Sequence, residues 1–485
     1  MPRATHRSAT VVSLLLALFM AAMEMTVVST ALPTVVADLG GAGHYAWVFT
    51  AYMLASTVTV PIYGKLADLY GRKPVMLASI TLFLLGSMAS GQARTMAQLV
   101  LFRGIQGLGA GGMQPMALTI VGDIFSIEER GKMQGLFGAV WAIAGLVGPL
   151  LGGLIVATLS WRWVFYVNVP FGALSAALLV FALVEDVERR PHTLDVAGAA
   201  LMGGAVVLLL LASEGTMPAV LLPGSLGLLA AFVVVERRAE EPVLSLALLG
   251  RRVIATSSAL SALIGAVMLG IVSFVPLYVQ GVLGGSPTTA GVAIAPIAIG
   301  WPIASAVAGR ILPKVGFRPL VRVGSVVVVA SAEALAMLVG RGSGDVPLRI
   351  ATAAVGVGLG LANTALVIAV QASVDFSERG VATASTMFFR NIGGTVAVGG
   401  MGVVLARGLG SGRDELVSRV LGPERRSVGS EELRSVSESL AHGVTDVLWI
   451  VVALAAASAV VGVLFPAVST GSAEHRGRSE AKPLA

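Results

Sequence analysis

Long apolar runs, separated by short charged segments, make up most of this chain. A run of about 20 apolar residues matches the thickness of a lipid bilayer, so the pattern predicts an all-α polytopic membrane protein with about fourteen transmembrane helices. A count of twelve would leave the apolar runs near 193–213 and 218–236 outside the membrane. The helices are expected near residues 11–37, 46–69, 75–91, 97–122, 131–158, 163–184, 193–213, 218–236, 253–282, 287–311, 319–340, 346–374, 380–407 and 442–465.

An internal repeat divides this series of helices. The sequence GRILPKVGFRP at Gly309–Pro319 repeats the spacing of GKLADLYGRKP at Gly64–Pro74, although Pro313 stands where Asp68 stands. The displacement exceeds a six-helix half by about two helices, which indicates an insertion between two halves. The predicted parts are an N-terminal six-helix bundle in 1–190, two inserted linker helices in 191–240, a C-terminal six-helix bundle in 241–470 and a cytoplasmic tail in 471–485.

One connecting segment is long. Residues 408–441 are polar, mixed in charge and weakly periodic at helical spacing, so we expect an outer loop with short helical pieces. Two interpretations stay open: the loop caps the outer mouth of a transport path, or it is a solvated hairpin that the fold tolerates.

Composition places the chain in lipid and its charge gives an orientation. Hydrophobic residues make up 56% and charged residues 12%, more apolar surface than one core could hide. The lysines and most arginines gather on one predicted side, as cytoplasmic loops do, so the net charge of +6 does not indicate nucleic-acid binding. We expect a multi-pass protein of the plasma membrane, such as a bacterial inner membrane, with both termini in the cytoplasm. The chain has no cysteine, and none of its histidines falls in the interior of a predicted helix, so no metal site is expected within the membrane.

The segment Gly64–Pro74 resembles the loop between the second and third helices of the major facilitator superfamily. Four further segments resemble, in order, the motifs of the drug:proton antiporters with fourteen transmembrane helices. These segments are Met23–Val35, Leu99–Gly112, Ala142–Ile155 and Trp161–Gly172. The resemblance implies the major facilitator fold and a proton-coupled multidrug efflux transporter, which exports lipophilic or cationic compounds by alternating access.

Two charged residues inside apolar runs are the predicted proton-coupling site. Glu24 falls near the middle of the first predicted helix, where an ionised carboxylate is costly unless it is paired, protonated or exposed to a polar cavity. Arg103 on the fourth predicted helix matches the family position that assists proton transfer. The alternatives are a purely structural bridge or a glutamate that only packs. Arg390 is a second buried cation that could pair with Glu24.

The loop residues Asp68 and Arg72, with Gly64 and Gly71, are predicted to form a gate on the cytoplasmic side together with Asp123. The resemblance implies that Asp68 and Arg72 engage the acid at the end of the fourth helix. It also implies that Asp68 faces the N-terminus of the helix beginning near residue 380. Contacts made in one conformation only would set the free-energy gap between two states. The alternative is that these residues mark topology alone.

Further candidates come from the fifth helix and from polar residues in apolar runs. The glycines and proline of GPLLGG resemble the family's antiporter motif, and they allow a bend and close helix approach. They are Gly148, Pro149, Gly152 and Gly153. Polar residues that could line the substrate cavity, or equally bond helix to helix, are Gln106, Gln114, Asn168, Tyr278, Gln280, Asn363, Gln371 and Arg390. Glu333 is expected to pack or snorkel, and Glu214 to be interfacial.

Other functions remain to be weighed against drug efflux. A lipid or lipid-like exporter of the same fold is one alternative, and a non-transporting membrane sensor or scaffold is another. An enzyme is not expected, because no paired carboxylates or activated nucleophile can be assembled from these helices. No cofactor is expected, and no phosphate-binding loop indicates ATP as the fuel. The expected partners are a small lipophilic or cationic substrate, protons and membrane lipids, with no nucleic acid, and the protein is expected to act as a monomer.

Overall fold

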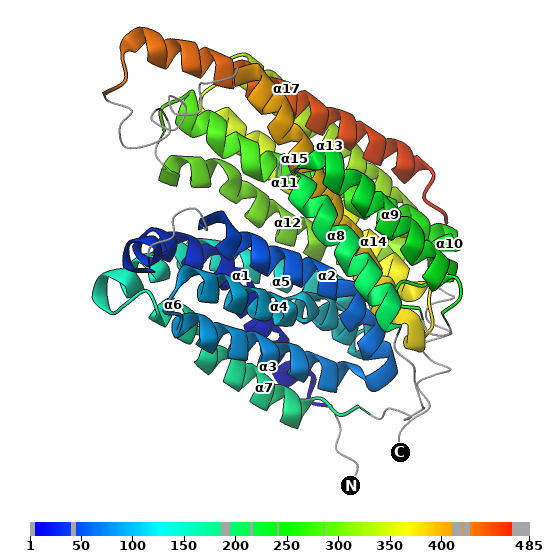
Figure 1. Cartoon of the computed structure of the whole chain (residues 1–485). Helices are drawn as coiled ribbons and strands as arrows, with labels where there is room; N and C mark the ends of the chain where they lie inside the picture. The colour runs from blue at the N-terminus through cyan, green and yellow to red at the C-terminus, as the bar shows by residue number, and fades with distance from the viewer. Residues whose placement is uncertain are drawn as a thin grey trace. The chain divides into compact units, whose positions relative to one another are not determined.

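The computed structural model describes residues 5–39, 45–185, 195–213, 217–239, 242–285, 287–409, 420 and 427–467. Within these ranges the chain is helical and contains no strand (Figure 1). The elements before the insertion are α1 Arg7–Leu39, α2 Tyr45–Tyr70, α3 Arg72–Gly91, α4 Met96–Ile124, α5 Ile127–Thr158, α6 Trp163–Tyr166 and α7 Asn168–Ala182. The remaining elements are α8 Val196–Ser213, α9 Pro218–Glu236, α10 Leu246–Gly250, α11 Arg252–Gly281, α12 Pro287–Val315, α13 Phe317–Gly340, α14 Asp345–Ala372, the 3-10 helix η2 Phe376–Glu378, α15 Arg379–Leu409 and α17 Ser430–Val463.

Each predicted helix overlaps a helix of the structure, and the fold is that of an all-helical membrane protein. Within the described ranges, eleven helices are long and apolar enough to cross a membrane. Helices α2 and α4 are not among the eleven, and Val196–Ala212 in α8 is a shorter apolar helix. The count of fourteen spans therefore stays a prediction. Glu214 and the predicted tail 471–485 lie outside the described residues.

The last helix begins earlier than the sequence pattern predicts. Helix α17 starts at Ser430, so residues 430–441 of the expected outer loop are helical. Glu431 and Glu432 occupy its first turn, where negative charge favours the helix N-terminus. Val436 and Leu440 are buried one turn apart on the same face. The helical spacing of this polar segment agrees with the extension, although the apolar run alone places the start of the helix near 442. Residues 410–419 and 421–426 of the expected loop lie outside the described ranges.

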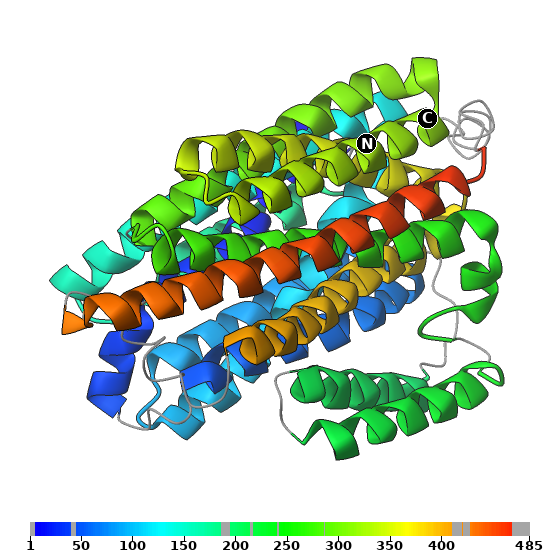
Figure 2. The ribbon, with the colours of Figure 1, turned by 90° about the horizontal axis from the view of Figure 1, so that it is seen from above.

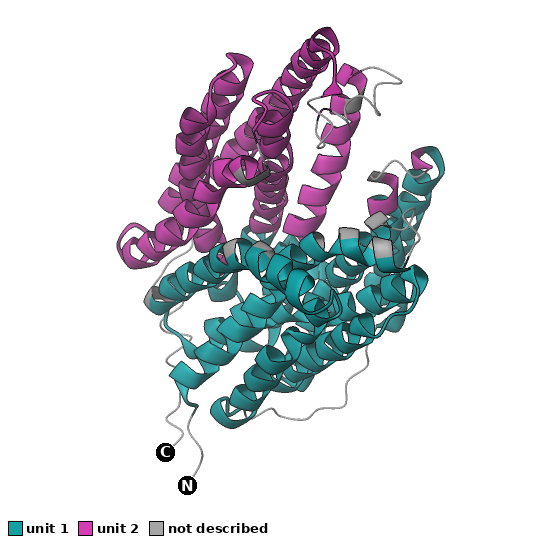
Figure 3. Cartoon of the chain, turned by 90° about the vertical axis from the view of Figure 1, so that its left-hand side faces the viewer, with its two compact units in different colours: residues 1–209, 219–254, 370–388 teal, residues 210–218, 255–369, 389–485 magenta. Residues whose placement is uncertain are grey.

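The chain forms two compact units (Figure 3). Unit 1 comprises residues 1–209, 219–254 and 370–388, and unit 2 comprises residues 210–218, 255–369 and 389–485. The end of α14 and the first residues of α15 thus belong to the same unit as the N-terminal helices. Between the sequence halves, α8 and α9 lie side by side (Figure 2), where the Ser225 hydroxyl donates to the Ala205 carbonyl at 2.8 Å.

Close helix contacts in unit 1 depend on small residues of α4. A methyl group added at Gly107 would lie 2.4 Å from the Tyr52 carbonyl oxygen on α2, and one added at Gly109 would lie 2.3 Å from the Phe83 nitrogen on α3. Helix α1 packs on α5 and α7, with a buried apolar cluster that includes Met23 and Phe165. Backbones that approach this closely fix the positions of the few polar side chains inside the unit.

Candidate functional site

A buried ion pair lies inside unit 1. Glu24 on α1 is 1% exposed and Arg103 on α4 is 0% exposed. The Arg103 Nη1 donates to Glu24 Oε1, and Asn168, the first residue of α7, donates from Nδ2 to Glu24 Oε2 at 2.5 Å. Asn168 also donates to the Ser87 hydroxyl at 3.0 Å. Three helices therefore position one carboxylate, with a partner for each of its oxygens.

Arg103 has further contacts that hold it in place. Its Nε donates to the Val48 carbonyl at 3.1 Å, and its Nη1 donates to Gln106 Oε1 at 2.8 Å. Its guanidinium lies over the Tyr52 ring at 4.3 Å from the ring centre. A buried pair offsets its desolvation cost only when such extra contacts satisfy the charges. Arg103 is therefore fixed independently of Glu24.

The polar groups around this pair are not all satisfied. In the described part of the chain, Arg103 Nη2, Gln106 Nε2 and Asn168 Oδ1 are buried without a hydrogen-bond partner. An unpaired buried polar atom is costly, and such atoms are uncommon in structural cores. The cluster therefore contains more polarity than helix packing requires, which is typical of a functional site.

A second charged cluster surrounds the α2–α3 turn. The Asp68 carboxylate accepts from the backbone N–H groups of Gly380 and Val381, at 2.9 and 2.8 Å. These two groups belong to the first turn of α15, where N–H groups lack helical partners and the helix dipole favours negative charge. Arg72 Nη2 lies 3.1 Å from Asp68 Oδ1. The carboxylate is thus bound by a helix N-terminus and by a cation.

Asp123, at the end of α4, lies between two arginines. Arg72 Nε donates to its Oδ2 at 3.0 Å, and Arg379 Nη1 donates to its Oδ1 at 2.7 Å. The guanidinium of Arg72 also lies 4.1 Å from the centre of the Phe376 ring. The structure thus brings Asp68, Arg72 and Asp123 together, as the sequence predicts, and adds Arg379.

Two glycines shape this cluster. Gly71 has φ 94°, a left-handed conformation that a side chain disfavours, and it precedes the first residue of α3. A methyl group at Gly64 would lie 2.5 Å from the Ala384 Cβ and 2.9 Å from the Gly380 carbonyl oxygen. Gly64 therefore lets α2 approach α15 closely enough for Asp68 to reach its N–H groups.

Sequence reasoning missed two carboxylates: Glu185, which lies beside this cluster, and Glu236, which lies in the insertion. Glu185 accepts from the backbone N–H groups of Arg72 and Lys73, both at 2.8 Å, and so caps α3 from a distant loop. In the insertion, Glu236 accepts from the Leu244 N–H at 2.6 Å. A charge in a loop looks ordinary in sequence, so only the three-dimensional contact reveals these roles.

The antiporter-like segment of α5 contacts α1 through two of its glycines. A methyl group at Gly148 would lie 1.9 Å from Thr26 Oγ1, and one at Gly152 would lie 2.1 Å from Thr30 Oγ1. Gly153 has no heavy atom within 4 Å of such a position. The Pro149 side chain lies outside the described residues. The close surface of this segment therefore faces α1, the helix that carries Glu24.

The remaining polar candidates have varied surroundings. Within unit 1, the Gln371 amide donates to the Leu118 carbonyl at 3.1 Å. In unit 2, the Tyr278 hydroxyl donates to the Ser343 carbonyl at 3.1 Å, and Asn363 is 5% exposed. Half-buried candidates are Gln114, Gln280 and Arg390. The suggested pairing of Arg390 with Glu24 joins different units and stays a prediction, and Glu333 is exposed on α13.

At the other end of unit 1, Asp38 lies outside the apolar span of α1. Its Oδ2 accepts from the Trp161 indole at 2.8 Å and from Arg162 Nη1 at 3.1 Å. These hydrogen bonds hold the pKa of the Asp38 carboxyl below its ordinary value, the Trp161 bond contributing most.

No group of three histidine, aspartate or glutamate side chains that could hold a metal occurs in the described ranges.

Comparisons with known proteins extend over most of the chain. Residues 14–398 match the profile of the Major Facilitator Superfamily. The multidrug transporter protein MdtP of Bacillus subtilis is 35% identical over 83% of this chain and 76% of its own length. Multidrug resistance protein 3 of the same organism is 42% identical over 64% of this chain, and the match spans 62% of that relative. A solved structure of the proton:xylose symporter XylE has a TM-score of 0.64 at 12% identity, covering 96% of this chain and 97% of its own.

Proposed function

Because this chain belongs to the Major Facilitator Superfamily and is a multi-pass membrane transporter rather than an enzyme, we propose that it is a proton-coupled efflux transporter. It exchanges protons for lipophilic or cationic compounds by alternating access. Relatives at 35% and 42% identity bear the names multidrug transporter and multidrug resistance protein, which supports this substrate class. The proposal includes a location in the cell membrane with both termini in the cytoplasm, supported by the lysine and arginine bias of the loops.

The buried pair of Glu24 and Arg103 is the observation that carries the proposal. A proton that reaches Glu24 neutralises the carboxylate and leaves Arg103 without its anion. Arg103 keeps its contacts with the Val48 carbonyl and the Tyr52 ring, so the cation stays in place while its pairing energy is lost. Protonation then changes the relative stability of two conformations, as coupling requires.

The charged cluster at the α2–α3 turn supports the conformational part of the proposal. Asp68 binds the first turn of α15, and Asp123 binds both Arg72 and Arg379. Contacts between segments so distant in sequence can exist only while α15 lies against α2 and α4. They stabilise one state, and a substrate or a proton must offset their energy to reach the other. Each charge that crosses a membrane potential of 100 mV supplies about 2.3 kcal/mol toward that change.

Transport in proteoliposomes with an imposed pH gradient tests the proposal. We expect Glu24→Gln to reduce proton-driven efflux of a cationic dye by at least about tenfold, equivalent to about 1.4 kcal/mol. Glu24→Asp keeps the acid and should retain part of the activity. The matched control is Glu333→Gln, which removes an exposed acid of α13 and should leave efflux unchanged. If Glu24→Gln pumps as well as the parent, the proton-site assignment is wrong; efflux of phospholipids in place of dyes would favour a lipid exporter.

A further inference from the structure

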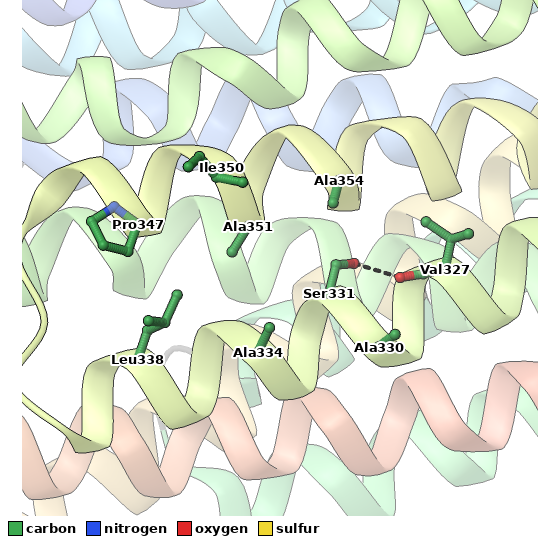
Figure 4. Close-up of a pocket in the computed structure, with 9 residues that line it drawn as sticks. All are labelled: Val327, Ala330, Ser331, Ala334, Leu338, Pro347, Ile350, Ala351 and Ala354. Carbon is green, nitrogen blue, oxygen red and sulfur yellow. Dashed lines mark hydrogen bonds between the residues drawn. The ribbon is translucent and has the colours of Figure 1, made fainter.

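An open groove lies between α13 and α14 in unit 2 (Figure 4). Its volume is about 480 Å³, within the range of about 300–1,000 Å³ that holds small molecules. Five of its lining residues are alanine or serine, which leaves space between the two helices. The lining residues are Val327, Ala330, Ser331, Ala334, Leu338, Pro347, Ile350, Ala351 and Ala354.

The two helices meet at one end of this groove. A methyl group at Gly324 on α13 would lie 2.8 Å from the Gly358 carbonyl oxygen on α14, so the backbones touch there. Midway along the groove the alanine side chains are too short to fill the gap, as Figure 4 shows for Ala334 and Ala351, and Leu338 and Pro347 lie nearest the turn. The groove therefore runs from a closed end at the glycine contact to the turn after Gly340.

The lining of the groove is almost entirely apolar, which suits a hydrocarbon chain. Ser331 is the polar side chain of the lining, and its hydroxyl donates to the Val327 and Val328 carbonyls of its own helix, at 2.7 and 3.1 Å. Both helices are candidate membrane spans. Apolar side chains around the groove are exposed, such as Val326 at 60% and Ile350 at 69%. Lipid is therefore the medium that covers this face.

The length of the groove matches the hydrocarbon thickness of one leaflet. Leu338 lies eleven residues beyond Val327 on α13, which corresponds to about 16 Å along a helix. The hydrocarbon core of a bilayer is about 30 Å thick, so one leaflet contributes about 15 Å. One acyl chain that enters at the α13–α14 turn therefore reaches the closed end near the middle of the membrane.

Charged residues lie at the turn that forms the open end of the groove. Arg341 follows α13 and is exposed, and Arg349 lies in the second turn of α14. Arg349 pairs with Asp345, and its Nε is buried without a hydrogen-bond partner among the described residues. Because Arg349 and Asp345 neutralise each other, Arg341 leaves this end with a net positive charge, and a guanidinium group binds phosphate through paired hydrogen bonds.

We propose that this groove is a binding site for one phospholipid, whose acyl chain lies between α13 and α14 and whose phosphate is bound at Arg341. The site does not depend on the proton coupling proposed above, because it requires only that α13 and α14 face lipid. It places a lipid at a position that no residue of the candidate transport site occupies.

Native mass spectrometry of the full chain in detergent tests this proposal with phosphatidylglycerol as the probe. We expect Ala334→Phe, which fills the groove, to weaken binding of one phosphatidylglycerol by about tenfold. The matched control Val460→Phe adds the same ring to an exposed position of α17 and should bind like the parent. Ala351→Leu fills the groove with a smaller side chain from α14 and should give the same direction of change if Ala334→Phe folds poorly.

The headgroup is tested separately. Arg341→Gln should weaken binding of phosphatidylglycerol by about fivefold, since one cation near the lipid surface contributes about 1 kcal/mol. Arg94→Gln removes an exposed arginine of unit 1 and should have no effect. Equal binding by the parent, Ala334→Phe and Ala351→Leu overturns the site. Binding of a long-chain alcohol as tight as that of phosphatidylglycerol overturns the phosphate contact, and a dimer that disappears in Ala334→Phe would show a second copy as the occupant.

Discussion

The two repeated turns of this protein, Gly64–Pro74 and Gly309–Pro319, share a backbone and differ in charge. Gly71 has φ 94° and Gly316 has φ 79°, and each immediately precedes the helix that follows its turn. The residue after the glycine is buried in both copies: Arg72 is 3% exposed and Phe317 is 1% exposed. The shape of the turn is therefore independent of the side chain that it buries.

The charges give the first copy contacts that the second cannot make. Asp68 binds the start of α15, and Arg72 binds Asp68 and Asp123. In the second copy, Pro313 has no carboxylate and Phe317 is apolar, so this position packs without an ion pair. Glycine thus determines the geometry of the turn, while the aspartate and the arginine determine what the turn binds.

Exchanging the buried residue of the first turn, Arg72, should give the largest decrease in the free energy of unfolding. Arg72→Phe copies the second turn into the first and leaves Asp68 and Asp123 buried without this cation. Breaking a buried pair costs about 3–5 kcal/mol, and we expect that loss in the free energy of unfolding measured in micelles. Phe317→Leu keeps an apolar side chain and should cost about 1 kcal/mol. Equal losses in the two variants would contradict the distinction between the copies.

Asp68→Asn tests the contact with α15 and should have a smaller effect on stability than Arg72→Phe. The amide keeps one acceptor but loses the charge, which should weaken the contact by about 1–3 kcal/mol. Since the chain has no cysteine, Ser385→Cys on α15 provides a single buried reporter in unit 1. We expect maleimide labelling of this cysteine to become about tenfold faster in Asp68→Asn. Pro313→Ala should leave the labelling rate unchanged, and unchanged labelling in Asp68→Asn would count against a gate.

Alanine at each turn glycine tests what the copies share. Gly71→Ala and Gly316→Ala both force a side chain into a positive-φ, extended conformation that is essentially restricted to glycine, at a cost of about 1–3 kcal/mol each. We expect similar decreases in unfolding free energy, because both turns have positive φ. A loss confined to Gly71→Ala would show that the charged contacts, and not the backbone, account for its sensitivity.

Asp38 provides an exposed reference for the buried charges and should show the smallest effect. Its folded-state pKa is lowered by Trp161 and Arg162, so its contribution to stability is present above its unfolded pKa. That contribution is lost as the pH falls below about 4, through the lower folded-state value. The unfolding midpoint of Asp38→Asn should therefore vary less with pH in this acidic range than that of the parent. Identical pH profiles would rule out this contribution.

The sequence pattern predicts the helices well and their ends less well. Apolar runs place the interior of each helix, because lipid requires them to be apolar along their length. At Ser430 the helix continues into polar sequence, where hydropathy gives no signal. The sixth predicted helix is likewise divided into α6 and α7 near Val167, a break that the apolar pattern does not contain.

The site is predictable to the extent that its charges are unusual for their surroundings. Glu24 and Arg103 stand out because each interrupts an apolar run, and Asn168 was recognisable only as a polar residue. Its contact with the Glu24 carboxylate depends on the packing of α7 against α1. Glu185 and Arg379 lie in or beside loops, where charges are common, and their partners are more than 100 residues away.

The packing of Gly148 against Thr26 bears on how mutants of this transporter should be interpreted. Thr26 follows Glu24 by two positions, so the two side chains point to different sides of α1. A bulkier residue at Gly148 would push α1, and the carboxylate with it, away from α5 and out of register with its amide and guanidinium partners. A screen that scores only drug resistance would then assign proton handling to a glycine that has no proton to exchange.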